Sequence, residues 1–561
     1  MTTSTFREPN TVAFSGSQRR PSRFLEMLAN PWWSTRRERL RTTVLWAATL
    51  LAGFVSSPLW AADGPNVVVV LADDLGYADV SCYGGKISTP HIDRLAATGM
   101  RFTDAHTSSS VCSPTRYGLL TGRYNWRSRL KRSVLGGLSP RLIEPDRVTL
   151  AGFLQGQGYH TACIGKWHLG MDWKLKPGKE VTPLGIEPRE QVFNVEYGAP
   201  IANGPAAVGF DYFFGISASL DMVPYAYIEN DRVTELPTED RDFPMMDGRQ
   251  TGRTRKGPTA PGFDAADVLP MLVRKSVEYI DERARSGESD GGRQPFFLYV
   301  PLASPHTPIL PTPAWRGKSG INPYADFVME SDWAVGQIVA ALERNGVAEN
   351  TLIVFTSDNG CSPQAKFDEL AAHDHYPSGP LRGHKADLFE GGHRIPMVVS
   401  YPGVTAAGTV SEQVVCLTDI FATVAAAIGV DDLAADMAED SFSFLTALKG
   451  ETSASGVRES LVSHSINGSF AIRRGDWKLM LCGDSGGWSA PRPGSPAAGK
   501  LPSRQLYHLG EDLAEQENRI ADRPEVAAEL LELLENLVAE GRSTPGPRQE
   551  NTGAVTIESG R

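Results

Sequence analysis

The chain has 561 residues, which is too long for one ordinary hydrophobic core and indicates one large and one smaller domain. Hydrophobic residues make up 41% and charged residues 22%, a balance typical of soluble globular proteins rather than disordered or membrane proteins. The formal net charge of −11 gives no support to nucleic-acid binding. The six cysteines form no Cys-x-x-Cys pair, which argues against a zinc site and against a dense disulfide scaffold.

The segment 1–61 is expected to form an N-terminal extension and a secretory signal peptide. A basic stretch at 36–41 precedes an apolar run at 42–55, and the segment 56–61 ends in a small side chain. This order is typical of an export signal, and the apolar run is short for a stable membrane span. We expect an exported protein with no stable span after cleavage, with an uncleaved N-terminal membrane anchor as the alternative.

The first element of the mature chain is predicted to be a buried strand at 66–72. Its apolar residues are continuous and rich in β-branched side chains, which is typical of a strand covered on both faces. Asp73 and Asp74 follow at its carboxyl end, where open α/β sheets place their ligand sites. Adjacent acids on a loop are often only solvated, but these two abut the core, so the pattern favours metal binding.

A helix predicted at 89–96 leads to the segment that dominates the sequence, residues 110–123. Pro114 has a backbone torsion suited to the first turn of a helix, so Cys112 is expected just ahead of that helix, near its positive end. Arg116 then lies one turn away and can hold an anion or an oxygen nucleophile. The plain alternative is a buried, inert thiol before an ordinary helix.

Three more predicted strands end in polar side chains. The strand at 159–164 is followed by Lys166 and His168, and the strand at 295–300 by His306. A buried strand from 351 ends at Asp358 and Asn359, which repeats the pattern of the first strand. Taken alone, Lys166 and His168 could equally be a surface lysine and a satisfied core histidine.

Helices are predicted at 150–157, 264–285 and 325–344, alternating with these strands. Such alternation indicates a large, mostly parallel sheet flanked by helices. Residues 183–265 are rich in Pro, Gly and charge and are the candidate substrate rim.

We expect a catalytic domain over 62–452 and a small C-terminal α+β domain over 453–541. The smaller domain has three short strands within 461–481 and a helix at 525–540. A tail at 542–561, rich in Gly, Pro and Ser, is expected to be disordered.

Residues 112–123 resemble the signature of the type I sulfatases, which belong to the alkaline-phosphatase-like superfamily. Cys112, Pro114, Thr115 and Arg116, followed by Thr121 and Gly122, fill its defining positions. The resemblance extends from about 66 to the segment 505–509 and implies that a maturing enzyme oxidises Cys112 to formylglycine.

The same resemblance implies a site and a reaction. Its metal ligands would be Asp73, Asp74, Asp358 and Asn359, with the residue made from Cys112 as a further ligand. The cation would be one Ca²⁺, with Mg²⁺ possible, because carboxylate and amide oxygens suit hard cations. By the same implication, Arg116 steadies the aldehyde hydrate, Lys166 and Lys385 bind sulfate, and His168 and His306 act as base and acid.

The expected reaction is hydrolysis of an aryl or carbohydrate sulfate ester, in which a formylglycine hydrate is the nucleophile and a second hydroxyl expels sulfate. The partners would be a sulfated small molecule or glycan and the formylglycine-generating enzyme. One alternative is a phosphomonoester or phosphodiester hydrolase of the same superfamily, because the site suits any tetrahedral oxyanion. A second is a non-catalytic protein that binds sulfated glycans.

Overall fold

The computed structural model describes residues 64–286, 293–451 and 457–557. The expected signal peptide and the rest of 1–61 lie outside these residues, as does the domain boundary expected at 452–453. Across the described ranges, we find no helix with the length and apolar character needed to cross a membrane.

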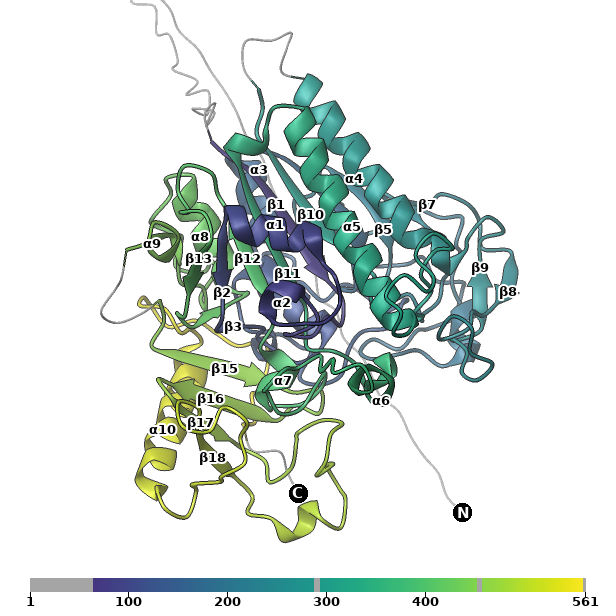
Figure 1. Ribbon diagram of the computed structural model, residues 1–561. Helices are drawn as coiled ribbons and strands as arrows, with labels where there is room; N and C mark the ends of the chain where they lie inside the picture. The colour runs from purple at the N-terminus through teal and green to yellow at the C-terminus, as the bar shows by residue number, and fades with distance from the viewer. Residues whose placement is uncertain (1–63, 287–292, 452–456, 558–561) are drawn as a thin grey trace, which may run out of the picture. The chain divides into compact units, whose positions relative to one another are not determined.

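A ten-stranded sheet forms the centre of the described chain (Figure 1). Its five middle strands are parallel, and further strands in mostly antiparallel pairing extend it on both sides, which confirms the expected large, mostly parallel sheet. The order is β13 (Thr409–Ser411), β2 (Met100–Phe102), β12 (Met397–Ser400), β11 (Thr351–Ser357), β1 (Asn66–Ala72), β10 (Phe296–Pro301), β4 (His160–Lys166), β5 (Tyr212–Ile216), β6 (Ile228–Glu229) and β7 (Arg232–Val233).

Strands β1 and β11 lie side by side in the middle of this sheet, and all their residues are buried. Continuous apolar runs form such strands because the sheet is covered on both faces. The parallel register pairs Ala72 with Ser357, so the two strands end at the same edge. The backbone N–H of Asp358 then donates to the carbonyl of Ala72 at 3.0 Å. This register brings Asp73 and Asp358 to one place.

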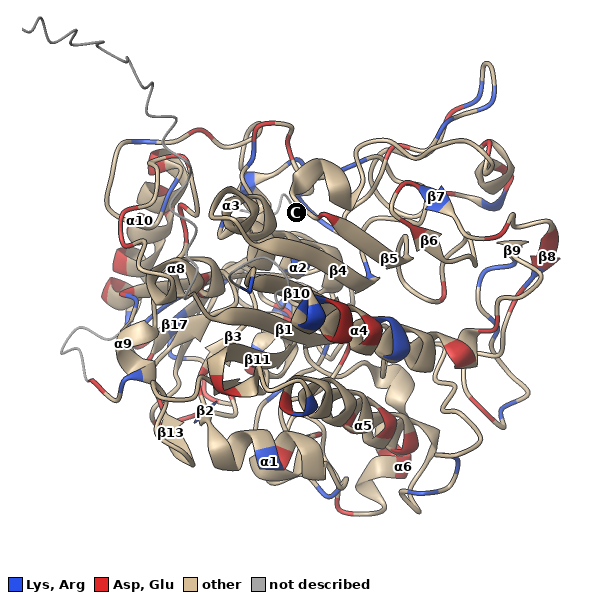
Figure 2. Ribbon diagram, turned by 90° about the horizontal axis from the view of Figure 1, so that it is seen from above, with Lys and Arg blue, Asp and Glu red and all other residues tan. Residues whose placement is uncertain are grey.

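Helices cover both faces of the sheet (Figure 2). On one face, α5 (Pro323–Arg344) packs against α1 (Pro90–Thr98) and α4 (Val268–Arg285). On the other, α2 (Cys112–Thr121) packs against α3 (Leu150–Gly156) and α8 (Asp419–Ala427). The charged residues of α4 lie away from its buried face, as expected of an amphipathic helix, whereas α5 buries Asp326, Glu330 and Asp332. Shorter helices are α6 (Phe367–Ala371), α7 (Glu390–His393) and α9 (Leu445–Leu448).

The segment 183–265 has short elements and long connections, but one part of it was not expected. β5 joins the central sheet next to β4, with a parallel register that pairs Lys166 with Ile216. No strand is predicted from the sequence in this segment. The remaining pieces include the small sheet of β8 (Glu239–Arg241) and β9 (Gly257–Thr259). A second two-stranded sheet joins β3 (Ala105–His106) and β14 (Val415–Cys416).

The C-terminal part contains a four-stranded antiparallel sheet (Figure 1). Its strands are β15 (Ser460–His464), β16 (Phe470–Arg474), β17 (Trp477–Met480) and β18 (Gln505–His508), and α10 (Pro524–Glu540) packs against β16 and β17. The expected sheet and helix are therefore present. The fourth strand, β18, was not predicted because the long connection 481–504 separates it from β17.

Residues 542–557 are not the disordered tail that their composition suggested. The Ser543 hydroxyl donates to Asp440 Oδ1 at 2.6 Å. Arg123 Nη2 donates to the Glu550 carbonyl at 2.6 Å, and Arg127 Nη1 to Asn551 Oδ1 at 3.0 Å. Buried guanidinium groups require acceptors, and this segment supplies them. The composition of 542–557 does not reveal that buried arginines need these acceptors, because the arginines lie far earlier in the chain.

Candidate active site

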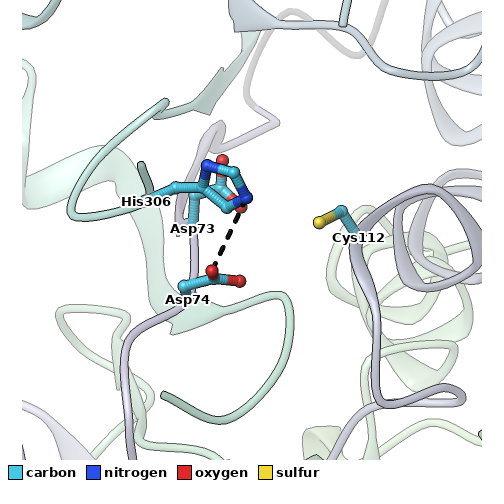
Figure 3. Close-up of side chains that lie close together, drawn as sticks. All are labelled: Asp73, Asp74, Cys112 and His306. Atoms are coloured by element: carbon cyan, nitrogen blue, oxygen red, sulfur yellow. Dashed lines mark ion pairs between the residues drawn. The ribbon is translucent and has the colours of Figure 1, made fainter. Parts of the chain in front are cut away.

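Four polar side chains converge at the carboxyl edge of the central strands (Figure 3). Asp73 and Asp74 follow β1, His306 follows β10, and Cys112 is the first residue of α2. All four are buried, and one potential ligand atom from each lies within 4.8 Å of the others. Segments that are far apart in the sequence thus meet at the carboxyl edge of an α/β sheet, where such folds place their sites.

Each of the two adjacent aspartates faces a lysine. Lys166 Nζ donates to Asp73 Oδ2 at 2.6 Å. Lys385 Nζ lies 2.7 Å from both oxygens of Asp74. Burial disfavours the Asp73 carboxylate, but the charges of Lys166, His306 and Arg116 hold the pKa of Asp73 well below its usual range. Asp73 is therefore ionised at neutral pH.

The acid that follows β11 is held by an arginine. Arg116 donates to Asp358 Oδ2 from Nε at 3.1 Å and from Nη2 at 2.8 Å, and its Nη1 donates to the Lys166 carbonyl at 2.8 Å. Burial and the nearby charge of Asp73 raise the pKa of Asp358 to about 7, against the opposing charge of Arg116. Such crowding of carboxylates is relieved by a cation.

Two oxygen atoms at this edge are buried and accept no hydrogen bond from the described part of the chain: Asp73 Oδ1 and Asn359 Oδ1. Asn359 Nδ2 donates to Asp74 Oδ1 at 2.7 Å, so its amide lies against the acids. Buried polar atoms need partners, and oxygen atoms from carboxylates and an amide are the donors that hard divalent cations prefer. Asp73, Asp74, Asp358 and Asn359 therefore fit a Ca²⁺ or Mg²⁺ ion.

The Cys112 side chain is only 2% exposed. Burial raises the pKa of its thiol to about 12, although the charges of Lys166 and Lys385 act in the opposite direction. The thiolate is the reactive form of cysteine, and it is scarce at neutral pH when the pKa is this high. As encoded, this side chain is poorly suited to act as a thiolate nucleophile.

The two histidines of the site differ in their partners. His168 has a positive φ of 55°, and its Nε2 lies 2.8 Å from the Leu135 carbonyl, which makes Nε2 the protonated nitrogen. Its Nδ1 is buried and bonds to no group in the described ranges. Burial and the charges of Lys166 and Arg116 hold the pKa of His168 well below its usual range. Its imidazole is therefore neutral, with a free lone pair on Nδ1.

His306 instead bonds through Nδ1 to the Thr307 carbonyl at 2.6 Å, and its Nε2 lies 3.6 Å from Asp74 Oδ2. A residue that the sequence did not indicate joins it. Ser219 Oγ lies 3.1 Å from Lys166 Nζ and 3.3 Å from the His306 ring nitrogens. A single serine in an irregular segment carries no motif, so no signal in the sequence marks it.

These contacts connect all the predicted site residues except His168. That histidine lies two residues after Lys166 in the chain. Two histidines that the sequence analysis did not assign to the site, His384 and His393, have different surroundings. His384 Nδ1 lies 3.0 Å from the carbonyl of Lys385. His393 belongs to a second buried group with His106 and Glu390.

Lys478 Nζ occupies this second group, 2.9 Å from Glu390 and 3.2 Å from His393. A lysine ammonium among the potential ligands supplies the positive charge that a metal ion would bring, so this group is an ion-pair network. It links β17 to α7 and to β3.

Comparisons with known proteins agree on one family. A family model described as Sulfatase matches residues 65–430. An N-acetylgalactosamine-6-O-sulfatase of Bacteroides thetaiotaomicron is 33% identical over 504 residues, covering 84% of this chain and 93% of that protein. Arylsulfatase A of Bos taurus is 32% identical, covering 88% and 90%. A solved structure from work on glycosaminoglycan metabolism by Bacteroides thetaiotaomicron is 31% identical, with a TM-score of 0.71 over 85% of this chain and 99% of its own.

Proposed function

The chain belongs to the sulfatase family and is a sulfuric ester hydrolase of the type I, alkaline-phosphatase-like class, and we propose that its nucleophile is a formylglycine made from Cys112. The observation that carries the proposal is the position of Cys112. This thiol is buried at the start of α2, faces Asp73 and Asp74, and has a raised pKa (Figure 3). Carboxylates and a hard cation are poor companions for a thiolate but suit a hydroxyl.

We further propose that Asp73, Asp74, Asp358 and Asn359 hold one divalent cation, Ca²⁺ in preference to Mg²⁺. The support is the cluster of acids and two buried oxygens that have no hydrogen-bond partner among the described residues, Asp73 Oδ1 and Asn359 Oδ1. Ca²⁺ accepts more oxygen ligands in less regular geometry than Mg²⁺, which suits four protein side chains. When bound, the ion would make a hydroxyl of the modified residue more acidic and offset the charge of the sulfate.

The two lysines are proposed to bind the sulfate oxygens. Burial disfavours the ammonium of Lys385, but the charges of Asp74 and its neighbours hold the pKa of Lys385 above its usual value. Both lysines lie within 2.7 Å of site carboxylates and already point into the site. Fixed positive groups that face the developing charge need no rearrangement during the reaction, which is the largest catalytic effect in many enzymes. Arg116 fixes Asp358 and is proposed to steady the hydrate.

The histidines are proposed to divide the proton transfers. His306 bonds to the Thr307 carbonyl through Nδ1, which leaves Nε2 to protonate the leaving alcohol oxygen. His168 is neutral, and its Nδ1 has no hydrogen-bond partner in the described part of the chain, so it is proposed to accept the proton of the second hydroxyl as sulfate is released. The partners of each ring thus suit opposite roles.

The substrate is proposed to be a carbohydrate sulfate. The support is the similarity over most of the chain to a protein named for N-acetylgalactosamine 6-O-sulfate, which makes that sulfated sugar the first compound to assay. A formylglycine-generating enzyme is the proposed maturation partner. We propose that the protein is exported, because the segment 36–61 has the features of a signal peptide.

A parallel assay tests the reaction class. The protein with confirmed Cys112 modification is offered aryl and sugar sulfates, and phosphate monoesters and diesters of the same alcohols, beside a Cys112→Ala control. We expect sulfate turnover to exceed phosphate turnover and to be lost in the control. Preference for the phosphate esters would favour the phosphohydrolase alternative, and retention of sulfated glycans without turnover would favour the binding-protein alternative.

A further inference from the structure

An exposed indole stands beside one of the two site lysines. Trp488 lies in the long connection between β17 and β18, and it is 37% exposed. The centre of its ring is 5.9 Å from Lys385 Nζ, within the range of a cation–π contact. Lys385 in turn contacts Asp74 at 2.7 Å. The residue therefore borders the site while remaining partly exposed to solvent.

The backbone that carries this ring is held firmly by the loop that carries Lys385. One oxygen of the buried Asp387 accepts hydrogen bonds from the N–H groups of Trp488 at 2.7 Å and Ser489 at 3.0 Å. The Leu388 N–H donates to the Ser485 carbonyl at 2.8 Å. The other Asp387 oxygen accepts from the His384 N–H at 3.0 Å. A single carboxylate thus ties Trp488 to the residue that precedes Lys385.

The residues before the tryptophan fit this close approach. A Cβ atom added at Gly487 would collide with the Ala386 carbonyl and the Asp387 carboxylate, so only glycine lets the two loops meet. Gly486 has a φ of 67°, in the left-handed region that other residues avoid. These features fix the position of an indole that stays 37% exposed.

The chemistry of the ring indicates what it contacts. The flat face of an indole packs on the C–H groups of a sugar ring, and a rigid aromatic side chain provides this contact area at a small entropic cost. The sulfur of a sulfate ester is joined to its sugar through one oxygen. A sulfate held by Lys385 can therefore bring the attached sugar within reach of the indole, whose ring centre is 5.9 Å from Lys385 Nζ.

We propose that Trp488 is a substrate-specificity residue that stacks on the ring of the sugar bearing the sulfate ester. This inference rests on the proposed function, because it takes Lys385 as a sulfate-binding group. It adds a contact from the connection between β17 and β18 to a site otherwise built by the ends of the central strands, α2 and the loop that carries Lys385. The rival explanation is that the indole only covers the Lys385 ammonium.

The test compares KM, kcat and binding in the full chain with Cys112 modification confirmed. With N-acetylgalactosamine 6-sulfate, Trp488→Ala and Trp488→Leu are each expected to raise KM about tenfold with a smaller change in kcat. Trp488→Phe keeps an aromatic face and should recover most of the loss. Trp315→Ala is the matched control, because Trp315 lines a separate cavity with Pro270 and Trp333, and its KM should equal that of the unmutated protein.

A binding measurement separates failure of this inference from failure of the proposed function. In the Cys112→Ala background, which cannot turn over, the affinity for the same sugar sulfate is measured by calorimetry with and without Trp488→Leu. About tenfold weaker binding supports the proposal even if another substrate is the true one. Unchanged affinity, no detectable binding of the sugar sulfate, or a loss confined to kcat would overturn it. Sulfatase activity of the unmutated protein would stand in each of those cases.

Discussion

Replacing Lys385 with methionine tests the electrostatic design of the site. The ammonium is buried, with the residue 6% exposed, and it lies 2.7 Å from both oxygens of Asp74. Methionine keeps the apolar part of the side chain and removes the charge. Loss of one fixed group that faces developing charge lowers kcat/KM by about 100- to 1,000-fold, or roughly 2.7 to 4 kcal/mol of transition-state stabilisation.

The same substitution has a second measurable effect. It leaves the Asp74 carboxylate buried without its ammonium partner, and breaking a buried ion pair from one side costs about 3 to 5 kcal/mol of unfolding free energy. Bound calcium would partly neutralise Asp74, so the loss of stability should be larger after chelation. Urea denaturation with and without calcium measures both quantities.

Controls separate charge from shape. Lys385→Arg restores a cation and should recover part of the activity. Lys174→Met removes a lysine that is 60% exposed and pairs with Glu196 at 2.8 Å, and an exposed pair of this kind contributes less than about 1 kcal/mol. The reasoning would be refuted if Lys385→Met kept kcat/KM within about threefold of the unmutated protein.

Two further predictions concern the cation and a buried acid outside the site. Prolonged chelation should abolish sulfate hydrolysis. Calcium at about 100 times its Kd should restore the activity and add about 2.7 kcal/mol to the unfolding free energy. Full activity after chelation would contradict the assignment of the four ligands. Burial raises the pKa of Asp332 to about 7, although its carboxylate accepts the N–H groups of His91 and Ile92. Between about pH 4 and pH 7 the folded state keeps a proton on Asp332 that the unfolded state loses, so the unfolding free energy falls as pH rises. The Asp332→Asn variant lacks this loss. In denaturant titrations it should therefore gain stability relative to the unmutated protein between about pH 5 and pH 8. Identical pH dependence of the two proteins would show that Asp332 is ionised when folded.

The sequence was most informative for strands whose own residues indicate that they are buried. Residues 66–72 and 351–357 are continuous apolar runs, so the burial of both strands could be predicted. Their pairing with each other is a finding of the structure, and the meeting of Asp73 and Asp358 was expected from the family resemblance. The segment at Cys112 was recognisable because its defining residues all lie within the short stretch 112–123. A motif of this kind can be recognised from the spacing of its residues alone, without knowledge of the fold.

The parts that escaped prediction depend on partners far away in the chain. Ser219 can be recognised as a site residue only from its contacts with Lys166 and His306. Similarly, β5 can be recognised as a strand of the central sheet only from its pairing with β4. Trp488 reaches the site through hydrogen bonds from its backbone to Asp387, which lies far earlier in the sequence. Residues 542–557 are held in place because they supply acceptors such as the Glu550 carbonyl to buried arginines. The composition of the segment does not show this.

The central claim is that the nucleophile derives from Cys112. Mass spectrometry of the peptide that contains Cys112, taken from the same sample whose sulfatase activity is measured, tests it most directly. The activity of a series of preparations should rise in proportion to the fraction of that peptide that carries formylglycine. A fully active preparation in which Cys112 remains an unmodified thiol would contradict the account.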